Sequence, residues 1–195
     1  MCVKHKIAIF ASGYGSNFEA IARAAISGEI ECKVSLLVCD RPSSRACEVA
    51  KELGIPSFVF SAKEFSSKEE YEAKIVEQLK AANVELVCLA GYMRIVGKVL
   101  LDAYGGRIIN LHPSLLPAFK GAKAIEQALE YGVKVFGATI HYVDASLDGG
   151  KIIAQRAIAY EGNDIEELKS KIHIVEHELY ITTIKQLLGK LLKQI

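Results

Sequence analysis

The chain lacks the features that mark several broad classes of protein. No apolar stretch in its 195 residues is long enough to cross a bilayer, and no repeat, low-complexity tract or interdomain linker interrupts it. The N-terminal stretch MCVKHKIAIFAS has too short an apolar run for a secretion signal and no small-residue cleavage site. We therefore expect a soluble cytoplasmic protein with no membrane association. Since 51% of the residues are hydrophobic and 24% are charged, we also expect an ordered core, in a single domain over residues 1–195.

Cysteine pairs and an excess of charge are also missing. The five cysteines, at positions 2, 32, 39, 47 and 88, contain no C-x-x-C pair and are odd in number. This pattern favours thiols in a reducing cytoplasm over a disulfide framework. The net charge is only +1, so the chain has no global basic field, and nucleic acid is not favoured as a partner.

Short apolar runs alternate with amphipathic segments, which is typical of βαβ units and a largely parallel sheet. Strands are expected at 6–12, 33–40, 57–60, 84–91, 106–112, 135–144 and 151–160. Helices are expected at 17–28, 44–54, 66–83, 124–132 and 164–193, with a further short helix between the fourth and fifth strands. Gly28 is a stop signal for the first helix, and Ser67 and Glu70 have capping-box spacing at the start of the third. The sequence therefore predicts one α/β domain.

The turn SGYGSN (12–17) joins the first strand to the first helix. Its backbone N–H groups and the helix N-terminus favour an anion. Gly13 and Gly15 supply two glycines of a dinucleotide fingerprint, but Phe18 stands where the third is needed. Asp40, at the end of the second strand, could mimic the acid that binds ribose. A simple phosphate thus ranks above NAD, and taken alone the motif also fits a turn without a ligand.

The stretch HIVEH (173–177) matches a zinc pattern, H-x-x-E-H, with His173 and His177 on one helical face. Zinc chemistry would need a further protein ligand and a surrounding protease domain. Short patterns of this kind also arise by chance. We therefore favour an amphipathic helix that directs polar side chains into a cleft or solvent, and expect no metal.

The fifth strand ends in an unusual polar pair. Asn110 and His112 lie two residues apart and so point to the same side, and Pro113 ends the strand. Ligands of open α/β sheets bind at the carboxyl ends of strands. A local structural role would be the simpler interpretation of either residue alone, but the pair together favours a site.

A possible partner for His112 lies in the stretch HYVDASLDGGKII (141–153). Asp144 and Asp148 precede two glycines, and such residues are common in turns for local reasons. A carboxylate near His112 would nevertheless favour the imidazolium form, which suits a proton donor working near neutrality.

The segments IAIFASGYGSN, LAGYMRIV, INLHPSLLPAFKG and HYVDASLDGGKIIAQ, with Glu-His at 176–177, resemble the folate-dependent formyltransferases nearly end to end. The resemblance implies a three-layer α/β/α fold with a Rossmann-like N-terminal half. Its mixed seven-stranded sheet would have the order 3-2-1-4-5-6-7, with strand 6 antiparallel. The implied reaction transfers a formyl group from 10-formyltetrahydrofolate to the primary amine of glycinamide ribonucleotide in purine biosynthesis. A monomer or weak homodimer is expected, without a metal or covalent intermediate.

The resemblance also implies roles for individual residues. The catalytic set would be Asn110, His112 and Asp148, with Asn110 and protonated His112 stabilising a tetrahedral oxyanion. The nucleotide would be bound by Gly15, Ser16, Asn17, His173 and Glu176. The folate would be bound by Lys68, Met93, Arg94, Ile95, Val96, Asp144, Ala145, Ser146 and Leu147. We further expect a cis peptide bond between Leu116 and Pro117.

Other functions share part of this pattern. Methionyl-tRNA formyltransferase and formyltetrahydrofolate hydrolase have the same Asn/His/Asp set, but the first would carry a basic C-terminal domain and the second an N-terminal regulatory domain. A nucleotide- or folate-binding module without turnover is an alternative from another class, which the intact catalytic set disfavours. An NAD-binding protein is disfavoured by Phe18.

Overall fold

Seven strands form one mixed sheet in a computed structural model that describes the backbone of residues 5–191 and the side chains of residues 5–189. The strands are β1 (His5–Ala11), β2 (Cys32–Cys39), β3 (Ser57–Val59), β4 (Leu86–Leu89), β5 (Ile108–His112), β6 (Val135–Tyr142) and β7 (Ile152–Ala159). Their order is β3-β2-β1-β4-β5-β6-β7. Strands β1 to β5 pair in parallel, and β6 is antiparallel to both β5 and β7. The predicted order and the antiparallel sixth strand are confirmed.

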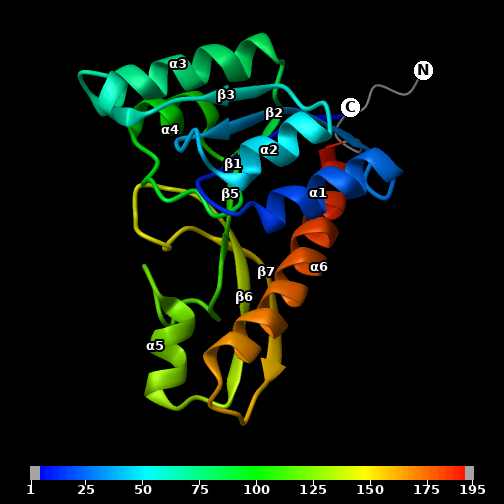
Figure 1. Ribbon diagram of the computed structural model, residues 1–195, viewed down its shortest axis with the longest axis vertical. Helices are drawn as coiled ribbons and strands as arrows, with labels where there is room; N and C mark the ends of the chain where they lie inside the picture. The colour runs from blue at the N-terminus through cyan, green and yellow to red at the C-terminus, as the bar shows by residue number, and fades with distance from the viewer. Residues whose placement is uncertain (1–4, 192–195) are drawn as a thin grey trace.

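Helices cover both faces of the sheet. They are α1 (Ser16–Ser27), α2 (Arg45–Glu52), α3 (Lys68–Ala81), α4 (Lys98–Tyr104), α5 (Ala124–Tyr131) and α6 (Ile165–Leu191), with a short 3₁₀ turn, η1 (Ala62–Glu64). Figure 1 shows α1 and α2 near the top of the long helix α6, which runs down beside β6 and β7. Helices α3 and α4 lie together next to β3. The predicted α/β/α layering is confirmed.

The central strands β1 and β4 are almost wholly apolar because both of their faces are buried, whereas β7, at one edge of the sheet, is partly exposed. Ile7 and Ile9 of β1 pack into the core with α1, α2 and α6. Ala8 and Phe10 alternate with them and pack into a second core with α3 and α4. A third cluster joins α5 to the ends of β6 and β7 and to the start of α6.

The element ends differ from the expected ones by a few residues. The first helix ends at Gly28, which has a left-handed φ of 82°, as predicted. The capping box at the start of α3 is only half formed: the Ser67 hydroxyl accepts the Glu70 N–H, but the Glu70 carboxylate accepts from Ser66 instead. The predicted end of the last helix, residues 192–193, lies outside the described residues. Over residues 5–191, no helix is both long and apolar enough to cross a membrane.

Successive strands are added to one side of β1 up to β3 and to its other side from β4 onward, so a crevice is expected between β1 and β4. Two contacts join the segments that follow these strands. The Ser12 N–H donates to the Gly91 carbonyl at 3.1 Å, and the Ser12 hydroxyl accepts the Met93 N–H at 2.9 Å. The carboxyl ends of β1, β4 and β5 therefore form one edge, on which the candidate site lies.

Candidate active site

Asn110 and His112 lie in the carboxyl-terminal half of β5, next to the antiparallel strand β6. Ile109 and Leu111 alternate with them and pack into the core with α6. Asn110 pairs with His141 of β6, and His112 pairs with Thr139. The buried apolar neighbours fix the strand, so both polar side chains have defined positions at its carboxyl end.

Both ring nitrogens of His112 have protein partners. Nε2 lies 2.8 Å from the carbonyl oxygen of Phe119, and it carries a proton because a carbonyl can only accept. Nδ1 lies 3.4 Å from Oδ2 of Asp148. A second proton on Nδ1 makes this contact attractive, whereas a lone pair there would face the carboxylate. Only 6% of the His112 side chain is exposed, so both contacts are largely shielded from solvent.

Asp148 lies in the loop between β6 and β7 and is held by the segment that follows β5. Its Oδ2 accepts the Gly121 N–H at 2.8 Å, and its backbone adopts a left-handed φ of 44°. At the nearby Gly150, an added Cβ would lie 1.8 Å from the carbonyl oxygen of Tyr142, so the loop requires glycine there. The structure thus brings Asp148 to His112, as the sequence predicted. Asp144, by contrast, is exposed and bonds to Ser146 within the loop.

His141 belongs to this cluster, although it was not expected from the sequence. Its Nε2 lies 3.2 Å from Nδ2 of Asn110 and 3.7 Å from Oδ1 of Asp148. Its Nδ1 lies 2.8 Å from the carbonyl oxygen of Tyr142. Burial lowers the pKa of His141 despite the nearby carboxylate. A polar residue inside the apolar run of β6 was the available signal.

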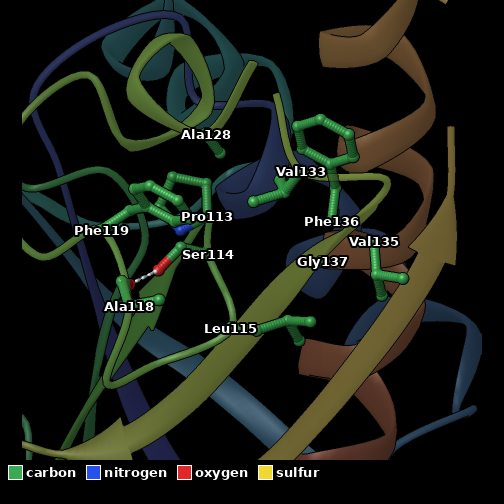
Figure 2. A pocket seen from close by; sticks show the side chains of 10 residues that line it. All are labelled: Pro113, Ser114, Leu115, Ala118, Phe119, Ala128, Val133, Val135, Phe136 and Gly137. Atoms are coloured by element: carbon green, nitrogen blue, oxygen red, sulfur yellow. Dashed lines mark hydrogen bonds between the residues drawn. The ribbon is translucent and has the colours of Figure 1, made fainter. Parts of the chain in front are cut away.

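The segment that supplies the Phe119 carbonyl is tightly bonded. It contains the predicted cis bond between Leu116 and Pro117. The Ser114 hydroxyl donates to the Ala118 carbonyl at 2.6 Å, as Figure 2 shows. The Thr139 hydroxyl donates to the Ser114 carbonyl at 2.6 Å and accepts the Leu116 N–H at 3.0 Å.

An apolar pocket of about 200 Å³ borders the same segment, between it, α5 and β6 (Figure 2). It is lined by Pro113, Ser114, Leu115, Ala118, Phe119, Ala128, Val133, Val135, Phe136 and Gly137. None of the predicted site residues lines this pocket, but it adjoins the candidate site through Phe119, whose carbonyl oxygen contacts His112.

The turn between β1 and α1 has the geometry of an anion site. Gly15 is left-handed, with φ 79°, and an added Cβ would lie 2.8 Å from Cβ of Ala46. The close approach of α2 therefore requires glycine at this position. The N–H groups of Ser16 and Asn17 lie in the first turn of α1, where they have no acceptor within the helix.

Asn17 and Glu176 meet although they are 159 residues apart. Nδ2 of Asn17 donates to Oε2 of Glu176 at 3.0 Å. Glu176 is buried, and this burial raises the pKa of its carboxyl group, while the bond from Asn17 acts in the opposite direction. His173 lies one turn earlier on α6, exposed, and is electrostatically linked to Glu176.

The segment after β4 exposes apolar side chains. Met93 and Ile95 are each 70% exposed, whereas Val96 is buried. Arg94 lies between them and is held on both sides, by Asp40 at 2.7 Å and by the face of the Tyr71 ring. Asp40 forms this ion pair and is therefore not free to bind a ribose. Together with the buried Phe18, this further weakens the NAD alternative.

Helix α3 supports the other end of this segment. The stem of Lys68 lies against Gly97, where an added Cβ would be 2.6 Å from Cε of the lysine. The buried carboxylate of Glu72 accepts the Gly97 N–H at 2.6 Å. Across the site, residues 144–147 are exposed, with Leu147 58% exposed.

Comparisons with known proteins agree with this architecture. The "Formyl transferase" family model matches residues 5–184. Phosphoribosylglycinamide formyltransferase of Bacillus subtilis (strain 168) is 51% identical over 185 residues, which cover 94% of this chain and 95% of that protein. The crystal structure of glycinamide ribonucleotide transformylase 1 from Geobacillus kaustophilus superposes with a TM-score of 0.93 at 49% identity, covering 95% of this chain and 100% of the other. The crystal structure of phosphoribosylglycinamide formyltransferase from Bacillus halodurans has a TM-score of 0.91 at 51% identity, covering 95% of this chain and 96% of the other.

Since the family model spans nearly all of the described residues and these relatives match over almost their whole lengths, the chain belongs to the formyl transferase family.

Proposed function

We propose that this protein is a phosphoribosylglycinamide formyltransferase, which transfers the formyl group of 10-formyltetrahydrofolate to the primary amine of glycinamide ribonucleotide. The products are formylglycinamide ribonucleotide and tetrahydrofolate, as in purine biosynthesis. The observation that carries the proposal is the cluster of Asn110, His112 and Asp148 at the carboxyl edge of the sheet. It lies on the same sheet edge as an anion-binding turn and a segment with exposed apolar side chains.

Glycinamide ribonucleotide binds along α1 and α6. Its phosphate accepts the N–H groups of Gly15, Ser16 and Asn17 at the N-terminus of α1. Glu176, which is oriented by Asn17, accepts the ribose hydroxyls. The exposed His173 lies one turn away and contacts the phosphate. These interactions use groups that the fold holds in place before the substrate arrives.

10-Formyltetrahydrofolate binds between the segment after β4 and the loop before β7. The exposed side chains of Met93 and Ile95 can pack against the flat faces of the pterin ring, as exposed apolar groups beside a polar cluster fit a ligand site. Arg94 is held by its ion pair with Asp40, and the buried side chain of Val96 anchors the segment to the core. Lys68 attracts the anionic folate tail. The loop of Asp144, Ala145, Ser146 and Leu147 covers the pterin.

The reaction is a direct transfer. The substrate amine forms a bond to the formyl carbon, and negative charge develops on the formyl oxygen. An N–H of Asn110 and the Nε2–H of His112 stabilise this charge. To do so, the formyl oxygen replaces the Phe119 carbonyl as the acceptor for Nε2. The negative charge of Asp148 keeps the imidazolium charged throughout.

Proton transfer completes the reaction. The attacking amine must lose a proton, and N10 of the folate must gain one as its bond to the formyl carbon breaks. Asp148, which lies 3.4 Å from His112 with 11% of its side chain exposed, helps a water molecule carry this proton. No covalent enzyme intermediate is formed.

The remaining properties follow the same proposal. The partners are the two small-molecule substrates, not a membrane or nucleic acid, and the protein acts in the cytoplasm as a monomer or weak homodimer.

An assay with several acceptors tests the function. Purified protein receives 10-formyltetrahydrofolate with glycinamide ribonucleotide, with initiator methionyl-tRNA, or with water alone. We expect formyl transfer only to the ribonucleotide. Formate release without an acceptor would identify a hydrolase, and the absence of turnover with every acceptor would favour a binding module.

A further inference from the structure

His141 is a buried histidine next to the catalytic cluster, with 3% of its side chain exposed. It faces Asn110 across the pairing of β5 with β6. We propose that His141 is a positioning residue, which orients the Asn110 amide so that an N–H group points to the developing oxyanion. The inference rests on the proposed function and adds a residue to it.

The backbone sets the protonation state of the ring. Nδ1 lies 2.8 Å from the Tyr142 carbonyl, so Nδ1 must carry a proton. In a neutral imidazole the other nitrogen, Nε2, then has a lone pair and can only accept. Burial lowers the pKa of His141, which favours this neutral form near pH 7.

This tautomer determines which way the Asn110 amide faces. Nε2 of His141 lies 3.2 Å from Nδ2 of Asn110, and a lone pair there accepts only from the amide NH₂ group. One N–H of Asn110 is thus used, and the second remains available for the substrate. A flipped amide would present its carbonyl oxygen instead, which would repel the oxyanion.

Proton uptake by His141 reverses this preference. A protonated Nε2 needs an acceptor, either the carbonyl oxygen of a flipped Asn110 amide or Oδ1 of Asp148, 3.7 Å away. The second option also draws Asp148 from His112. The titratable groups that face His141 are Asp148 and Asp144, which favour its charged form, and His112, which opposes it. The buried Glu176 of α6 interacts with Asn17, His173 and His112.

Two substitutions separate the hydrogen bond from the shape of the side chain. His141→Gln places an amide oxygen near the position of Nε2, and it cannot be protonated in this pH range. His141→Asn is too short to reach Asn110. We expect kcat to fall by roughly 10- to 100-fold in His141→Asn, less than the ~10²–10³-fold that loss of an oxyanion donor costs. His141→Gln should retain most of the wild-type kcat, and the KM of both substrates should change little in either variant.

The pH profile and a double-mutant cycle exclude a merely structural role. The ratio of kcat in His141→Gln to kcat in the wild type should rise as the pH falls through the pKa of His141, which burial holds below the ordinary value of about 6.5. In an Asn110→Ala background, His141→Asn should cause no further loss of kcat. The proposal would be overturned by an equal loss of kcat in His141→Gln and His141→Asn, or by a kcat ratio that does not change with pH. It would also be overturned if the losses of kcat from His141→Asn and Asn110→Ala were additive.

Nitrogen-15 NMR of the imidazole tests the same bond without turnover. We expect the Nε2 signal of His141 to be that of an unprotonated nitrogen near neutral pH, and a protonated Nε2 would overturn the proposal. This result stands even if the wild-type protein transfers no formyl group, in which case the proposed function fails instead.

Discussion

At the scale of single residues, the site is made by a few polar side chains that interrupt otherwise apolar strands. Asn110 and His112 were predictable from the sequence because an amide and an imidazole interrupt a buried strand at its carboxyl end. His141 gives the same signal on β6 but was missed, because its importance depends on the antiparallel register that places it opposite Asn110. The Phe119 carbonyl and Gly121 N–H could not be predicted, because every residue carries such groups and only the fold selects them.

The charge of Asp148 is expected to be needed for turnover. Asp148→Asn retains an oxygen for the Gly121 N–H but removes the negative charge beside His112. We expect a normal fold by circular dichroism and a fall in kcat of roughly 10²-fold or more. Asp102→Asn, which removes an exposed carboxylate on α4 outside the site, is the control and should retain most activity. Near-normal turnover of Asp148→Asn would contradict its assigned role.

Glu176 should make nucleotide binding depend on pH. Burial raises the pKa of its carboxyl group, so Glu176 gains a proton at a higher pH than an ordinary carboxylate as the solution becomes acidic. The neutral acid accepts ribose hydroxyls less well, so the KM of glycinamide ribonucleotide should rise on the acid side. Glu176→Gln should have a raised KM at every pH.

The ratio of the two KM values isolates this effect, because it cancels titration of the substrate phosphate, which occurs near about pH 6. The ratio of the Glu176→Gln value to the wild-type value should fall toward one as the pH decreases. Glu178→Gln, on the exposed side of the same helix, should behave like the wild type. A ratio that does not change with pH would refute the assignment.

At the scale of elements, turns and helix ends hold the site more than helix interiors do. All the expected helices and strands are present, because burial of the central strands on both faces of the sheet gives clear apolar runs. The half-formed capping box shows the limit of local signals: Ser66, one residue before the expected partner, takes the Glu70 carboxylate. The long-range cap that Glu72 makes on α4 has no local signal at all.

The β1–α1 turn can be tested with two neighbouring glycines. Gly15→Ala puts a Cβ on a left-handed residue, 2.8 Å from Ala46, and so displaces the N–H groups that bind phosphate. We expect a marked rise in the KM of glycinamide ribonucleotide. Gly13→Ala meets nothing within 4 Å and serves as the control, with a nearly unchanged KM. A similar KM in both variants would show that this turn does not bind the phosphate.

Glu72 should stabilise the junction of α3 and α4. Its two carboxylate oxygens accept the N–H groups of Gly97 and Leu100, at 2.6 and 3.4 Å. Glu72→Gln would turn an amide NH₂ toward one of these donors, so we expect unfolding in urea to show a loss of about 1–3 kcal/mol. The KM of the folate should rise as well, since Gly97 ends the pterin segment. Glu69→Gln, exposed in the first turn of α3, is the control, and an equal loss there would contradict the cap.

At the scale of the whole molecule, the sheet order brings distant segments to one edge. The strand order came from resemblance to a family, because apolar runs alone do not specify which strands are neighbours. The contact of Asn17 with Glu176 shows why: the two residues meet only because α1 and α6 pack on the same face. The single domain over residues 1–195 stays a prediction, and one cooperative unfolding transition would support it.

The most direct test of the account is a single-turnover measurement of formyl transfer, with enzyme in excess over 10-formyltetrahydrofolate and glycinamide ribonucleotide at saturation. Wild-type protein and His112→Ala are compared, and binding of each substrate is measured separately by calorimetry. We predict that both proteins bind both substrates and that only the wild type forms formylglycinamide ribonucleotide at an appreciable rate. Rapid transfer by His112→Ala, or no transfer by the wild type with both substrates bound, would contradict the account.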